Sequence, residues 1–359
     1  MEPEPCLRLG VIVCCRDEER AIERRLANLA NSHWPEAKGL HRVVVVDDGS
    51  RDGTAALAAK AISEAELTDP ASPAAVKFEL IANRLRPGKA GAITSGIEHL
   101  GASIEIVVLT DADVLNSPEA LLELCRAFAG HSELGMAFGT QRFVAALSPD
   151  GSTAAMGRGS AGGAYDRITA WVRALESRSG RAFSVHGQLL AWRARMNLRP
   201  RSAIAADDLD LMLQTRAAGM GVARVSRALF FEVKPAGALR RIQALRRARA
   251  YIQFMRTLEL KAAPEGLTRW QWRAYLWIPR MFPWIALAGL ALTFRLLQWG
   301  VRSFSDGPVF EDWKLFLEFI PWSVVAACVA YLWHVCSVIV EAQHLERGGT
   351  LDDRWSTTR

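Results

Sequence analysis

Two carboxylates follow a short apolar run in the first third of the chain, where Val107–Thr110 precede Asp111, Ala112 and Asp113. Such a run is typical of a buried strand in a parallel sheet. Open α/β sheets bind ligands beyond the carboxyl ends of their strands, and carboxylate oxygens placed there suit Mg²⁺ or Mn²⁺ that neutralises phosphate. We therefore predict a divalent cation at Asp113 and Asp111. The alternative is an ordinary Asp-rich turn after a strand.

Two further apolar runs end in polar residues. Val43–Val46 leads into Asp47 and Asp48, and Leu9–Cys15 leads into an acidic segment that contains Glu18. β-Branched runs of this kind favour buried strands. Because the carboxyl ends of parallel strands meet at one edge of a sheet, we expect all three groups of acidic side chains to lie at the same edge.

The elements that must position these side chains alternate along the chain. The patterns predict strands near 9–14, 42–47, 76–81 and 105–110 and helices near 18–31, 53–66, 89–100 and 117–129, with a later helix from 207. Strand–helix alternation indicates an α/β fold, with a mostly parallel twisted sheet and helices on both of its faces.

Six segments carry a family resemblance when they are taken in order. They are Val11–Glu19, Asp47–Thr54, Pro87–Gly96, Asp111–Asp113, His186–Arg193 and Ala206–Leu211. Together they resemble the family 2 glycosyltransferases, which use nucleotide-diphosphate sugars. Asp17 stands where the family usually has Asn. The resemblance covers roughly residues 9 to 250 and implies the GT-A fold and a metal-dependent transfer with inversion at the anomeric carbon.

The resemblance also implies a role for each matching residue. Asp208 would be the catalytic base, and Asp113, with Asp111, would hold Mg²⁺ or Mn²⁺. Donor contacts would come from Glu18, Asp47, Asp48, Lys89, Asp111, Gln243 and Arg246, and the acceptor side would include His186, Gly187 and Asp207.

Three alternatives to a single-addition transferase are open. Processive members of the family carry Gln-x-x-Arg-Trp, whereas Gln243–Arg247 ends in Arg, which favours the addition of one sugar over a processive polysaccharide synthase. An α/β nucleotidyltransferase would need a basic phosphate loop, and Gly88–Lys89 is not a Walker loop. An inactive scaffold would have lost its carboxylates, and all of them remain.

The composition limits the kinds of binding partner that the sequence predicts. The 359 residues carry a net charge of +6, and part of the basic excess is concentrated in an acid-free stretch from Arg240 to Arg256. No aromatic stacking pattern or reader motif accompanies these arginines, so nucleic acid is not predicted, and a membrane surface is favoured. The six cysteines form no Cys-x-x-Cys pair, so no zinc site is predicted.

The C-terminal third has a different character. Residues 319–340 contain no Asp, Glu, Lys or Arg and are long enough to span a bilayer, whereas 276–297 is a weaker candidate because it contains Arg280 and Arg295. Flanking arginines favour a hairpin with both ends inside. We thus predict a cytoplasmic catalytic domain over 1–235, basic interfacial helices over 236–272, a transmembrane hairpin over 273–343 and a tail over 344–359. The expected localisation is a multi-pass protein of the inner or plasma membrane, acting on a lipid-linked or glycan acceptor.

Overall fold

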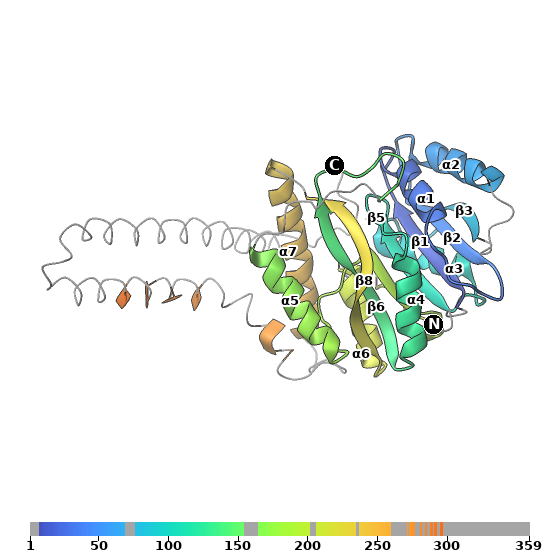
Figure 1. The fold of residues 1–359 in the computed structure, drawn as a ribbon. Coiled ribbons are helices and arrows are strands. Elements are labelled where there is room, and N and C mark those ends of the chain that lie inside the picture. The colour runs from blue at the N-terminus through green and yellow to red at the C-terminus, as the bar shows by residue number, and fades with distance from the viewer. Residues whose placement is uncertain are drawn as a thin grey trace, which may run out of the picture. The chain divides into compact units, whose positions relative to one another are not determined.

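The computed structural model describes residues 7–68, 76–153, 164–201, 206–234 and 237–259, together with short pieces between 271 and 296 (Figure 1). The chain divides into two compact units at Arg240–Arg241. The first unit contains the whole sheet and the helices α1 to α6. The second begins within α7, and the predicted domain limits at 235 and 272 stay predictions.

The first half of the first unit alternates strands and helices as predicted. Its elements are β1 (Leu9–Cys15), α1 (Ile22–Ala30), β2 (His41–Asp47), α2 (Thr54–Thr68), β3 (Val76–Ala82), α3 (Lys89–Leu100), β4 (Ile106–Asp111), β5 (Leu115–Asn116) and α4 (Ala120–Gly130). All the residues of β1 are buried, as are five of the six residues of β4, which fits their continuous apolar runs.

The second half contains longer and less regular strands. Its elements are β6 (Leu134–Val144), α5 (Ala164–Arg178), β7 (Leu189–Arg193), the 3₁₀ helix η1 (Ala194–Met196), α6 (Asp207–Ala217) and β8 (Gly221–Val233), and α7 (Gly237–Glu259) follows.

One sheet joins all eight strands in the order β3-β2-β1-β4-β7-β6-β8-β5. The first four strands run parallel, as predicted. β7 is antiparallel to both β4 and β6, whereas β6 and β8 are parallel and β5 is antiparallel to β8. The sheet is therefore mixed rather than mostly parallel, because β7 enters between two strands that run the other way.

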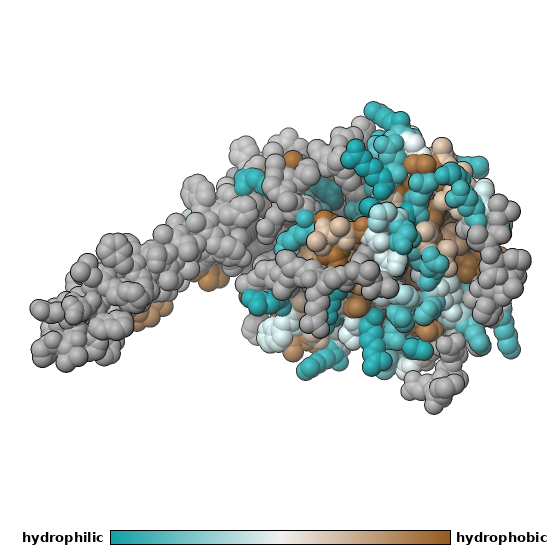
Figure 2. All heavy atoms as spheres, turned by 45° about the horizontal axis from the view of Figure 1, so that its top comes forward, coloured by the Kyte–Doolittle hydropathy of each residue, from teal (hydrophilic) through white to brown (hydrophobic). Residues whose placement is uncertain are grey.

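Helices cover both faces of the parallel half. One face carries the main core, in which Val11 and Val43 pack with Leu26 of α1, Ala58 of α2 and Leu121 of α4. On the opposite face α3 lies close to β1: an ideal Cβ on Gly96 would be only 2.8 Å from a side-chain carbon of Ile12. Hydrophilic and hydrophobic residues are interspersed over the described surface in view (Figure 2).

The predicted membrane localisation is contradicted. Within the described part of the chain, no helix is both long enough and apolar enough to cross a bilayer. The 23 residues of α7 provide the length but include six arginines, so this helix is too polar. Of the two predicted spans, 276–297 is described only in short pieces and 319–340 lies outside the described residues.

A tight backbone approach at Gly91 generates the first prediction. An ideal Cβ there would lie 1.9 Å from the carbonyl oxygen of Arg86, so Gly91→Ala must displace the 86–91 loop. We expect thermal unfolding to show a loss of about 1–3 kcal/mol, the usual cost of overpacking. The matched control is Gly130→Ala, where an added Cβ meets nothing within 4 Å; an equal loss in both variants would contradict the steric argument.

Candidate active site

The register of the strands brings acidic residues to one edge of the sheet. Cys15 of β1 pairs with Asp47 of β2, and its neighbour Cys14 pairs with Asp111 of β4, so the two carboxylates flank the end of β1. Because β7 is antiparallel to β4, it begins at this same edge, where Leu189 pairs with Thr110. The segment just before β7 therefore reaches the predicted site as well.

Asp48 is buried and holds the loop that starts α3. Its Oδ2 accepts a hydrogen bond from the backbone N–H of Gly88 (2.8 Å), and its Oδ1 accepts one from Nδ2 of Asn83 (2.5 Å). Nη1 of Arg16 lies 3.6 Å from Oδ2. Gly88 has φ of 123°, which favours glycine at this position. Asp48 thus fixes the residue immediately before Lys89.

The loops after β1 and β2 hold each other through short hydrogen bonds. Asp47 accepts from the hydroxyl of Ser50, and Ser50 Oγ accepts in turn from the backbone N–H of Asp17 (3.0 Å). The backbone N–H of Glu18 donates to Oγ1 of Thr54 (2.7 Å). Asp17 has φ of 55°, a left-handed conformation that Asn and Asp tolerate better than most residues. The result is a buried Glu18 at the end of β1.

Lys89 links two acidic segments that are far apart in sequence. Its Nζ lies 2.8 Å from Oδ1 of Asp111 and 3.8 Å from Oδ2 of Asp207, at the first residue of α6. Burial alone would lower the pKa of Lys89, but Asp111 and Asp207 raise it above its ordinary value. Lys89 is therefore a permanent cation between the end of β4 and the start of α6.

Three of the neighbouring carboxylates have raised pKa values. Burial raises the pKa of Asp113 to about 7, and the charges of Asp111 and Glu232 contribute. Burial and the neighbouring Asp207 raise the pKa of Asp208 to about 6, which the charge of Lys89 partly opposes. The pKa of Asp207 is also raised, chiefly by burial. The cluster holds more negative charge than Lys89 alone neutralises.

The segment before β7 meets the start of α6. An ideal Cβ on Gly187 would lie 3.4 Å from Cβ of Asp208, so these two predicted site residues are neighbours. His186 is buried between two aromatic rings, with ring centroids 5.9 Å from that of Phe138 and 5.4 Å from that of Phe230. These contacts give His186 a packing role, and its predicted acceptor role stays a prediction.

The donor set at Asp111 and Asp113 suits a hard divalent cation that shares its ligands with phosphate. Among the described residues, no group of three or more His, Cys, Asp or Glu side chains is arranged to hold a metal alone. Mg²⁺ typically takes one or two carboxylates and completes its shell with water and phosphate oxygens. The raised pKa of Asp113 fits such a site, because an added positive charge would relieve the repulsion among these carboxylates.

The structure thus brings most of the predicted site residues to one sheet edge. The residues assembled there are Glu18, Asp47, Asp48, Lys89, Asp111, Asp113, His186, Gly187, Asp207 and Asp208. Gln243 and Arg246 lie on α7 in the second unit, and their donor contacts stay predictions. Sequence reasoning missed Arg16 and Asn83, although each follows a predicted strand that ends at this edge.

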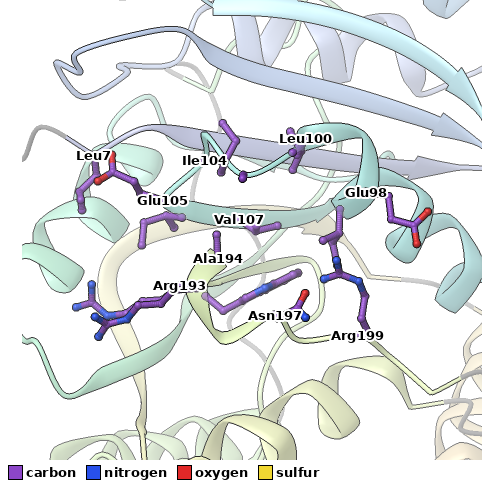
Figure 3. Close-up of a pocket in the computed structure, with 16 residues that line it drawn as sticks. Leu7, Glu98, Leu100, Ile104, Glu105, Val107, Arg193, Ala194, Asn197 and Arg199 are labelled. Atoms are coloured by element: carbon purple, nitrogen blue, oxygen red, sulfur yellow. The ribbon is translucent and has the colours of Figure 1, made fainter.

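A cavity of about 680 Å³ lies at the opposite edge of the sheet (Figure 3). It is lined by the end of α3, the start of β4 and the end of β7 with η1, including Leu100, Val107 and Arg193. Arg193 is already engaged there, since its guanidinium donates to the carbonyl oxygens of Phe128, His131 and Leu134. No predicted site residue lines this cavity.

The raised pKa of Asp208 predicts a pH dependence of stability. A carboxyl whose pKa rises from 3.8 to about 6 on folding binds its proton more tightly when folded, so it destabilises the protein as pH increases through that interval. Asp208→Asn should therefore raise the free energy of unfolding at pH 7.5 by on the order of 1 kcal/mol and flatten its pH dependence between the two values.

The matched control is Asp150→Asn. Hydrogen bonds from Ser148 and Ser152 lower the pKa of this exposed carboxylate, so its neutralisation should reduce stability at pH 7.5. Thermal unfolding at several pH values measures both variants. Destabilisation by Asp208→Asn at pH 7.5 would contradict the sign of the effect.

The chain is similar to known proteins in sequence and in fold. Residues 10–146 match the model of glycosyl transferase family 2. A mannosyltransferase from Pyrobaculum calidifontis, solved with GDP-Man and Mn²⁺, shares the fold with a TM-score of 0.61 at 21% identity, over 93% of this chain and 87% of that chain. Glucosyl-3-phosphoglycerate synthase from Mycobacterium tuberculosis, solved with phosphoglyceric acid, gives a TM-score of 0.44 at 17% identity, over 70% and 79% of the two chains.

No curated protein sequence matches the chain. The family model covers β1 to β6, the part that contains the acidic ends of β1, β2 and β4 together with Lys89. The match thus agrees, over residues 10–146, with the family resemblance drawn from the six motifs.

Proposed function

We propose that this protein transfers a sugar from a nucleotide-diphosphate donor to an acceptor hydroxyl, with inversion at the anomeric carbon. The observation that carries the proposal is the position of Lys89, which bridges Asp111 of the Asp-Ala-Asp turn and Asp207 beside the proposed base. A donor diphosphate at Lys89 and Asp113 would have its sugar on the side of Asp208. The mannosyltransferase of similar fold was solved with a donor of this class.

The donor side of the site is assigned to the strand ends. Asp47, Asp48 and Glu18 would contact the nucleoside, since they follow β2 and β1, and β1 pairs with β4. Lys89 would hold the diphosphate with its permanent charge. Mg²⁺ or Mn²⁺, held by Asp113 with Asp111, would supply charge neutralisation to the leaving diphosphate.

Asp208 is assigned the role of base for the acceptor. A hydroxyl is a weak nucleophile until its proton is removed, and a base works best when its pKa is near the working pH. A pKa of about 6 keeps Asp208 ionised at neutral pH while making it a stronger base than an ordinary Asp. Gly187 offers no side chain beside it, which leaves room for an acceptor on that side.

A single addition is proposed over processive synthesis. Arg247 is exposed on α7 at the position where processive relatives carry Trp, and an arginine does not offer the flat apolar face of an indole to an acceptor sugar. The acceptor class predicted from the sequence, a lipid-linked or glycan hydroxyl, stays a prediction.

Donor binding should depend on the cation. Calorimetry with GDP and UDP is expected to show binding in the presence of Mn²⁺ and a loss of at least about 10-fold in affinity with EDTA or in Asp113→Ala, because both changes remove charge neutralisation at the diphosphate. Asp150→Ala serves as the control, since Asp150 is exposed and lies outside the site. Equal affinity under all these conditions would exclude a cation at Asp113.

Removing the carboxylate of Asp208 should lower the rate of sugar transfer much more than it lowers the affinity for the donor nucleotide. Asp208→Asn keeps the shape but not the basicity, so turnover is expected to fall roughly 10²-fold or more while affinity for Mn²⁺ with GDP or UDP is retained. In the wild type, turnover should fall as pH drops through about 6, since the base becomes protonated. Chromatography of products at excess donor measures turnover, and one new species would support a single addition. Near-normal turnover in Asp208→Asn would remove Asp208 from the mechanism.

A further inference from the structure

Arg25 of α1 is a buried cation beneath the proposed cation site. Its side chain has no exposed surface, although arginine is almost never buried without a partner. All of its hydrogen bonds within the described residues go to neutral oxygens: Oγ1 of Thr110 (2.5 Å), Oδ1 of Asn28 (2.8 Å) and the carbonyl of Val114 (3.2 Å). No carboxylate forms an ion pair with it there.

These hydrogen bonds bracket the Asp-Ala-Asp turn. Thr110 immediately precedes Asp111, and Val114 immediately follows Asp113, so one rigid guanidinium bonds the Thr110 hydroxyl before the two carboxylates and the backbone carbonyl of Val114 after them. Such a planar group fixes two acceptors at a set distance from each other, which a flexible ammonium group does not do.

The same network continues to the side of the proposed base. The hydroxyl of Thr110 donates to the carbonyl of Gln188 (2.8 Å). Gln188 follows Gly187, and Gly187 is a neighbour of Asp208. On the other side, Asn28 accepts from the backbone N–H of Asn116 (2.8 Å) and donates to its carbonyl (3.0 Å). The network therefore joins α1, the turn after β4 and the segment before β7.

The charge of Arg25 also acts on the turn. Burial lowers the pKa of Arg25 to about 9, and the carboxylates of Asp111 and Asp113 are the charges that oppose this shift. At neutral pH the guanidinium is thus still positive, and it attracts the carboxylates of Asp111 and Asp113 without forming a hydrogen bond to either.

We propose that Arg25 is a positioning residue that sets the geometry of the Asp111–Asp113 turn for cation and diphosphate binding and couples that turn, through Thr110, to Gly187 and Asp208. The functional half of this inference rests on the proposed glycosyl transfer. The structural half, that Arg25 holds the turn, can be tested separately.

The test compares Arg25→Met, Arg25→Lys and Thr110→Val with the wild type. Arg126→Met is the matched control, because Arg126 is a half-exposed arginine of α4 that bonds to Glu123. The first measurement is hydrogen exchange of backbone amides. We expect residues 111–116 to exchange about 10-fold or more faster in Arg25→Met, while the amides of β2 keep their wild-type rates, because local opening is confined to the region that loses its support.

The second measurement is the affinity of the folded variants for Mn²⁺ with GDP or UDP. Loss of a residue that orients metal ligands typically costs about 10–100-fold in metal affinity. We expect a loss of affinity in this range for Arg25→Met and no change for Arg126→Met. Arg25→Lys should recover part of the affinity, because it keeps the positive charge but not the planar guanidinium. Thr110→Val should disturb exchange at 187–190 as well as at 111–116.

The outcomes separate the structural role of Arg25 from its role in nucleotide binding. If the wild type binds neither nucleotide with Mn²⁺, the proposed function fails, and the exchange rates still decide whether Arg25 holds the turn. If nucleotide binding is normal in the wild type and in all the Arg25 variants, the inference is overturned. Unchanged exchange at 111–116 overturns it also. If Arg25→Met does not fold, the comparison of Arg25→Lys with Thr110→Val decides in its place.

Discussion

The accumulation of carboxylates at one sheet edge is the constraint on which the rest of the structure depends. Asp111, Asp113, Asp207 and Asp208 lie close enough that charge from one raises the pKa of another. Like charges in a partly buried site repel strongly unless cations are interposed. Lys89 is such a cation, and its place between Asp111 and Asp207 determines how the end of β4 and the start of α6 approach each other.

The position of Lys89 depends in turn on a chain of backbone contacts. Asp48 holds Gly88 and Asn83, the carbonyl of Arg86 lies directly over Gly91, and Gly96 lets α3 approach Ile12 of β1. The parallel strands deliver these groups to one edge, and the reversed β7 adds Gly187 from the other direction. The backbone position of Lys89 is thus set by close contacts of the loop before α3 and by the short side chain of Asp48.

Sequence reasoning found the part of this arrangement that local patterns encode. The four parallel strands fell within one residue of their predicted limits because continuous apolar runs and the polar residues after them mark buried strands. The mixed order of β5 to β8 was not predicted, since strand pairing across a sheet depends on contacts between distant segments. The membrane localisation is contradicted because no helix of the described residues is both long enough and apolar enough to cross a bilayer, and the stronger predicted span, 319–340, lies outside those residues.

The hydrogen-bond partners of Arg25 could not have been found from its local pattern. Ile22, Arg25, Leu26 and Leu29 are spaced three and four residues apart, so Arg25 falls on the apolar face of α1, where an arginine is unusual. Only the tertiary structure reveals that its guanidinium donates to the hydroxyl of Thr110 and to the carbonyl of Val114.

Lys89 and Arg25, the two cations at this edge, therefore differ in whether a ligand can contact them. Lys89 is partly exposed, so an incoming diphosphate can compete with Asp111 and Asp207 for its charge. Arg25 has no exposed surface, so a ligand at this edge does not contact it directly. If the site binds and releases a nucleoside diphosphate as proposed, this division would let the turn keep its shape while the accessible charge changes partners.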